Sequence, residues 1–124
     1  MQVRLLDLKP LAEALRIARV ERGVKVYLLT TDRGLLHPES YGPGLALAGV
    51  AVRFLPSIGE EFFVVDRRVG LVLRRDYVGA QLEDAKPEPL VERFYRAFLQ
   101  AVPFSAEDWA YRLFQREYMR RGGP

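Results

Sequence analysis

The sequence contains no cysteine and a single histidine, His37, among its 124 residues. The missing thiols exclude disulfides, thiolate metal sites and a cysteine nucleophile, although they do not by themselves identify a compartment. A single imidazole excludes any site that takes two histidines from one chain. We therefore expect neither a metal nor a cofactor.

Several longer signals are also missing. There is no run of eighteen apolar residues, so we expect no membrane span and no membrane partner. The N-terminus MQVRLLDLKP lacks the pattern of a signal peptide, and we expect a cytoplasmic protein. The glycine-containing stretch YGPGLALAG, residues 41–49, has neither the GxGxxG spacing nor the Lys-Ser/Thr pair of a phosphate loop.

The composition is that of one globular domain, with 49% hydrophobic and 28% charged residues and a net charge of +3. The chain is arginine-rich, with sixteen arginines and three lysines. We attribute this ratio to a GC-rich genome. A thermophilic source is a further guess, because the proteome-wide trend in thermophiles does not favour arginine over lysine.

Hydrophobic periodicity predicts alternating strands and helices. Apolar runs or alternation predict an edge strand at 2–6 and further strands at 24–29, 50–55, 61–65 and 69–73. Helical spacing predicts helices at 7–23, 45–48 and 88–101, and Ser105 is expected to cap a last helix. Residues 30–42 are expected to form a loop, and 80–89 a polar boundary. This order predicts an α/β layer with a C-terminal helical hairpin.

The segments ALRIARVERGVKVYLLTTD, residues 14–32, and LALAGVAVRFLPSIGEEFFVVDRRVGLVLR, residues 45–74, resemble half of a phospholipase D-like domain. In that superfamily a helix ends in an Arg-Gly-Val-like turn before a core strand, and a second helix ends in an Ala-Gly-Val-like turn before the next strand. A hairpin then carries the signature HxKxxxxD. The match covers about residues 2–78. It implies an α/β half-domain with a mixed sheet flanked by helices, here residues 1–80, followed by a helical hairpin at 87–121 within the same domain. We expect 24–29, 50–55 and 61–65 to share one sheet.

The resemblance also implies that the catalytic signature is degenerate. If Asp66 is the aspartate of the motif, Gly59 stands where the nucleophilic histidine belongs and Glu61 where the lysine belongs. The family's Gly-Ser pair falls on Leu73 and Arg74. A phosphodiesterase needs an imidazole to attack and a cation to hold the phosphate charge, so we expect no catalytic residue and no enzyme. Asp66 is interpreted as a turn residue whose carboxylate accepts local backbone N–H groups.

His37 is the one imidazole that could replace the nucleophile. It precedes a proline in the segment LLHPES and has no lysine partner evident from the sequence. We interpret it as a surface-loop or locally hydrogen-bonded histidine.

Two groups of arginines are candidate contacts to small anions or nucleic acid, and their alternative is an ordinary solvated surface. The first group is expected to cluster on the hairpin and the second to form a stripe along the last helix. They are Arg67, Arg68, Arg74 and Arg75, and Arg112, Arg116 and Arg120.

The C-terminal hairpin holds eight of the fourteen aromatic residues. They either pack on the sheet of their own domain or present an interface, for which Trp109, Phe114 and Tyr118 are the candidates. Halves of the resembled fold commonly pair, which implies a homodimer. The expected function is that of a non-catalytic module that binds a small anionic ligand, has a regulatory role or binds a protein partner. The alternative is a nucleic-acid-binding protein that uses the arginine patches.

Overall fold

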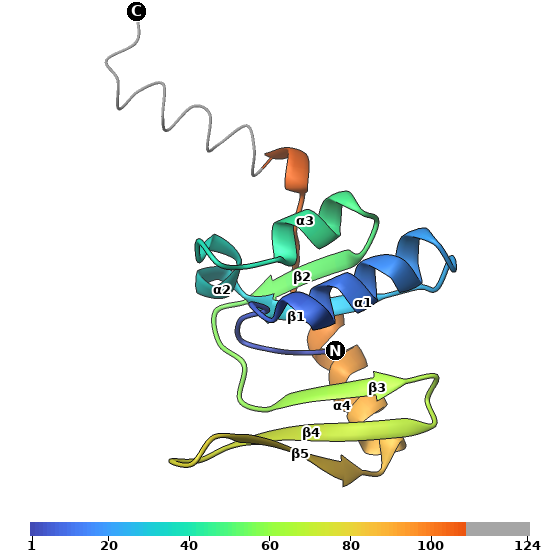
Figure 1. Ribbon diagram of the computed structural model, residues 1–124, viewed down its shortest axis with the longest axis vertical. Helices are drawn as coiled ribbons and strands as arrows, with labels where there is room; N and C mark the ends of the chain where they lie inside the picture. Colours follow the sequence, from blue (N-terminus) through green and yellow to red (C-terminus); the bar gives the residue numbers. More distant parts are fainter. Residues whose placement is uncertain (109–124) are drawn as a thin grey trace, which may run out of the picture.

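The computed structural model describes residues 1–108 and has a mixed α/β architecture with two small sheets and four helices (Figure 1). The strands are β1 (Tyr27–Thr31), β2 (Ala51–Leu55), β3 (Glu61–Val65), β4 (Val69–Arg75), β5 (Ala80–Ala85) and β6 (Val102–Pro103). The helices are α1 (Lys9–Val20), α2 (Asp32–Leu36), α3 (Gly42–Leu47) and α4 (Pro87–Gln100). None of the helices in these residues is long and apolar enough to cross a membrane.

The strands form two three-stranded sheets that Gln2 connects. In the first sheet β1 pairs in parallel with β2, and β2 pairs antiparallel with β6. The second is the antiparallel meander β3-β4-β5. Gln2 bridges Leu29 of β1 and Phe62 of β3. The expectation that 24–29, 50–55 and 61–65 share one sheet was wrong, because β1 and β2 lie in the first sheet and β3 lies in the second. The prediction of an edge strand at 2–6 was also wrong, because only Gln2 of that segment forms bridges and it lies between the two sheets.

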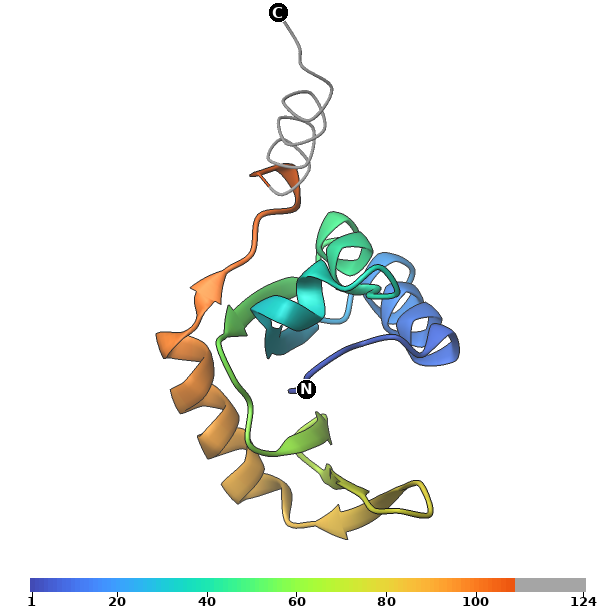
Figure 2. The same ribbon diagram turned by 90° about the vertical axis from the view of Figure 1, so that its left-hand side faces the viewer.

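Helices cover both faces of the β1-β2 pair. The face toward α1, α2 and α3 encloses a core around the fully buried Leu28, with Leu35 of α2 and Leu45 of α3 against it. Helix α4 lies on the other side and runs along both sheets (Figure 2). Its Leu90 packs on Phe62 of the meander, while Phe98 packs on Leu29 of the first sheet. One helix thus holds the two sheets together.

Helix α4 follows the sequence prediction closely. Helix α4 begins one residue before the predicted start and ends one residue before the predicted end. Its aromatic residues Phe94 and Phe98 stack on each other and pack against the sheets, whereas Tyr95 is exposed. Gly23 and Gly49 take positive φ values of 68° and 100° at the ends of helical segments, where only glycine avoids a steric penalty.

Two predicted irregular segments contain regular structure. Residues 30–42, predicted as a loop, contain α2, which Thr31 caps by accepting a hydrogen bond from the Gly34 N–H. Residues 80–89, predicted as a boundary, contain β5 paired with β4. All but the last residue of β5 are exposed. An exposed edge strand can be polar, and its composition therefore resembles that of a linker. Ser105 Oγ accepts from the Asp108 N–H as a helix cap would, at 3.2 Å.

Candidate functional site

The main polar cluster of the described residues surrounds Glu61 at the start of β3. This carboxylate is only 3% exposed, yet it accepts hydrogen bonds from two arginine side chains. Arg75 donates from Nε to Oε1 at 3.0 Å and from Nη2 to Oε2 at 3.4 Å. Arg4 donates from Nη1 to Oε1 at 3.3 Å, and its backbone N–H donates to Oε2 at 3.2 Å. Four hydrogen bonds thus compensate the buried negative charge.

Arg4 is held in place on both its main chain and its side chain. Its carbonyl oxygen accepts hydrogen bonds from the hydroxyls of Thr30 and Thr31, at 3.1 and 2.9 Å. Its side chain donates from Nε to the carbonyl of Ile58 and from Nη2 to the carbonyl of Gly59. Anchoring at several points lowers the conformational entropy that a long side chain would lose on meeting a ligand.

The Arg4–Glu61–Arg75 cluster carries a net charge of +1 and has donors to spare. The two guanidinium groups are 53% and 57% exposed. Each guanidinium has five N–H groups, and the five side-chain hydrogen bonds that the two arginines donate leave about half of these groups without a hydrogen-bond partner among residues 1–108. A fixed pair of guanidinium groups with free N–H donors suits a phosphate or carboxylate. The cluster holds no nucleophile and no general base that faces outward.

Two positions of the resembled signature, Gly59 and Asp66, lie at opposite ends of β3. Gly59 lies in the loop before β3, and open space surrounds the point where a side chain would begin. Asp66 and Arg67 have φ values of 54° and 58° in the tight turn between β3 and β4, which the Arg68 N–H closes onto the Val65 carbonyl. No hydrogen bond to the Asp66 carboxylate is present among residues 1–108, so the expected local acceptor role is not seen.

The hairpin arginines do not form one cluster, and that prediction was wrong. Arg67 and Arg68 lie in the β3–β4 turn, whereas Arg74 and Arg75 end β4. Arg74 lies six residues beyond Arg68 along the extended strand, a distance of roughly 20 Å. Arg74 pairs with Glu83 of β5 at 3.3 Å, with both side chains more than half exposed. One small anion can therefore contact only the pair at one end.

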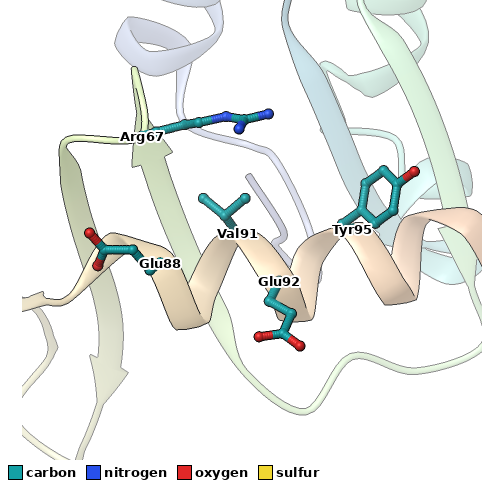
Figure 3. Close-up of a pocket in the computed structure, with 5 residues that line it drawn as sticks. All are labelled: Arg67, Glu88, Val91, Glu92 and Tyr95. Atoms are coloured by element: carbon teal, nitrogen blue, oxygen red, sulfur yellow. The ribbon is translucent and has the colours of Figure 1, made fainter.

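A shallow groove of about 510 Å³ lies at the turn end of the hairpin, beside α4 (Figure 3). Its lining residues are Arg67, Glu88, Val91, Glu92 and Tyr95. Figure 3 shows Arg67 extending above Val91, while Glu92 points the other way. One arginine and two glutamates give this groove a net negative charge, which does not suit an anion. The groove is also remote from Glu61, at the opposite end of β3.

His37 ends α2 on the surface, and its Nδ1 accepts a hydrogen bond from the Glu39 N–H at 3.1 Å. This geometry is the local hydrogen bonding expected from the sequence. Residues 1–108 contain no group of three histidine, aspartate or glutamate side chains able to hold a metal ion. The other candidate residues lie outside the described part of the chain, namely Trp109, Arg112, Phe114, Arg116, Tyr118 and Arg120.

Sequence reasoning missed Arg4, which lies far from Glu61 along the chain and next to it in space. The signal that points to it is weak: a charged residue inside the apolar segment QVRLL, and a second charge, Glu61, at the start of an apolar strand. Two such charges of opposite sign within apolar segments suggest a pair. Comparison with known proteins adds no assignment, since no protein-family model and no curated protein matches the chain.

Proposed function

We propose that this protein is a non-catalytic, phospholipase D-like module that binds a small anionic group at Arg4 and Arg75. The observation that carries the proposal is the state of Glu61. In the resemblance this position belongs to the lysine that holds phosphate, and here a buried carboxylate occupies it and binds two arginines. Gly59 supplies no nucleophile that could attack a phosphodiester, but the two half-exposed guanidinium groups can still hold an anion.

The chemical class of the ligand follows from the geometry. Two adjacent guanidinium groups with free N–H donors match the oxygens of a phosphate monoester or a carboxylate better than those of a neutral sugar. The site is open on the solvent side, so the rest of such a ligand can extend away from the protein. A regulatory or sensing role fits a module that binds and releases its ligand unchanged.

The test is a titration of the protein with inorganic phosphate, monitored through the NMR signals of the arginine Nε–H groups. The signals of Arg4 and Arg75 are expected to shift together, and Arg75→Gln is expected to weaken binding by roughly tenfold because a charge-assisted donor pair is lost. Arg68→Gln, an exposed arginine at the far end of the hairpin, is the matched control and should change nothing. Equal effects of the two substitutions would contradict an anion site at Arg4 and Arg75.

Catalysis is tested separately with a model phosphodiester. We expect no hydrolysis above the uncatalysed rate. Measurable hydrolysis that His37→Ala abolishes would overturn the non-catalytic proposal without touching the anion site.

A second candidate function, binding of single-stranded nucleic acid, is favoured by the tip of the β4–β5 hairpin. Tyr77 is fully exposed there, two residues after Arg75. Exposed aromatic rings stack on bases, and neighbouring arginines bind phosphates. A short oligonucleotide that binds with a steep salt dependence, and loses affinity on Tyr77→Ala, would put this function first.

A further inference from the structure

Strand β5 is an edge strand whose protection consists of two acidic side chains, Glu83 and Asp84. It pairs with β4 over six residues, from Ala80 to Ala85, without a break in register. Its other edge pairs with no strand among residues 1–108, and five of its six residues are exposed. The strand contains no proline, lysine or bulge, which are the common devices that keep an edge from pairing with another chain. Figure 1 shows it at the margin of the meander, beyond β4.

On one face of the meander, leucine side chains next to this edge form an apolar surface. Leu73 of β4 lies opposite Leu82 of β5, and Leu82 is 56% exposed. Helix α4 packs on the opposite face, through Phe62 and Val72. Residues that alternate with these, including Leu73 and Leu82, point to the other side of the sheet.

We propose that β5 pairs antiparallel with β5 of a second copy about a two-fold axis through Leu82. This register places Leu82 opposite Leu82 of the second copy. Because Leu82 already neighbours Leu73, a row of four leucines then crosses the seam on one face of a continuous six-stranded sheet. A two-fold interface of this kind uses the same surface on both copies and closes on itself.

The positions of the charged residues also favour the register centred on Leu82. The acidic residues Glu83 and Asp84 lie toward one end of β5, and they face the uncharged Gln81 and Ala80 of the second copy. Behind those two residues lie Arg74 and Arg75 of β4 in that copy. Each acidic residue is then about 10 Å from an arginine of the second copy, two strand spacings away. A register centred on Glu83 instead places two glutamates directly opposite each other, which is destabilising.

The pairing also accounts for the exposed tip of the β4–β5 hairpin. Tyr77 and Val78 are almost fully exposed, although hydrogen bonds to Asp76 Oδ1 from the N–H groups of Val78 and Gly79 fix their loop. In the paired strands this tip extends past the end of β5 in the second copy, toward Lys86 at the start of α4. The two apolar side chains then contact protein.

Sedimentation velocity over a range of concentrations tests the pairing. The protein is expected to sediment as a dimer. Leu82→Lys is expected to weaken the dimer by roughly tenfold or more, because two like charges then face each other at the axis. Leu47→Lys is the matched control, since Leu47 is similarly exposed on α3 and should leave the dimer intact.

The natural absence of cysteine allows a test of register. Under mild oxidation Leu82→Cys is expected to form a cross-linked dimer rapidly, because directly opposite residues place their Cβ atoms near disulfide distance. Gln81→Cys should cross-link slowly, since residue 81 faces residue 83 of the second copy. A monomer at every concentration, or a dimer that neither Leu82 substitution affects, would overturn the proposal. The inference does not rest on the anion site, and dimerisation and phosphate binding are measured separately because Leu82 lies on the same face of the sheet as Glu61 and Arg75.

Discussion

Replacing Glu61 with glutamine is expected to lower the free energy of unfolding by about 2 kcal/mol. The carboxylate is almost fully buried and accepts four hydrogen bonds. The amide group of glutamine turns N–H donors toward arginines that have only donors to offer, so part of the network is lost and two positive charges remain side by side. The expected cost is below that of breaking a fully buried pair, because Arg4 and Arg75 are both about half exposed and stay solvated.

Urea denaturation followed by circular dichroism measures this effect. The matched control is Glu83→Gln, which removes a carboxylate from an ion pair with Arg74 that is exposed on both sides. That substitution should change the free energy of unfolding by less than about 0.5 kcal/mol. Equal effects of the two substitutions would mean that Glu61 has no special structural role.

The Glu61→Gln variant also separates the effect of Glu61 on stability from its effect on phosphate binding. Glu61 competes with any ligand for the two guanidinium groups, so Glu61→Gln should bind inorganic phosphate at least as tightly as the unchanged protein while being less stable. Loss of both stability and phosphate binding would indicate instead that Glu61 must position the arginines. Either result distinguishes an anion site from a plain ion-pair network.

The sequence predicted the local elements better than their arrangement. The hairpin is recognisable because β3 and β4 are apolar runs joined by three residues, and β3 was predicted with its observed bounds. Helix α1 follows from its helical spacing, and its observed bounds, Lys9–Val20, lie within the predicted 7–23. Such signals depend on neighbouring residues alone, and periodicity reports them directly.

Long-range pairing was not predictable in the same way. The bridge from Gln2 to both Leu29 and Phe62 depends on strands distant in the sequence, and nothing in QVRLL distinguishes a central position from an edge. Strand β5 was missed because an exposed edge strand needs no apolar face. Glu61 was named only as a degenerate motif position and Arg75 only as one of the hairpin arginines, and their pairing with each other and with Arg4 arises only through the fold.

Substituting alanine for Gly34 is expected to cost about 3 kcal/mol of stability, the largest effect we predict for one added methyl group. A Cβ atom at this position would lie 2.0 Å from the carbonyl oxygen of Arg4 and 2.9 Å from the hydroxyl oxygen of Thr31. The first contact is with backbone, which cannot rotate away as a side chain can. That carbonyl also accepts the hydroxyl hydrogen bonds of Thr30 and Thr31, so moving it disrupts both.

Gly44→Ala in α3 is the matched control, because no atom lies within 4 Å of its added Cβ and its backbone is helical. Alanine there should be neutral or stabilise by up to about 1 kcal/mol, since glycine is the poorer helix former. Thermal unfolding of the two variants makes the comparison. If Gly34 acts through Arg4, its substitution should also weaken phosphate binding, whereas Gly44→Ala should leave binding unchanged. A stable Gly34→Ala variant with normal binding would show that the chain from 2 to 6 moves freely, and that the arginine site is not held as rigidly as its hydrogen bonds imply.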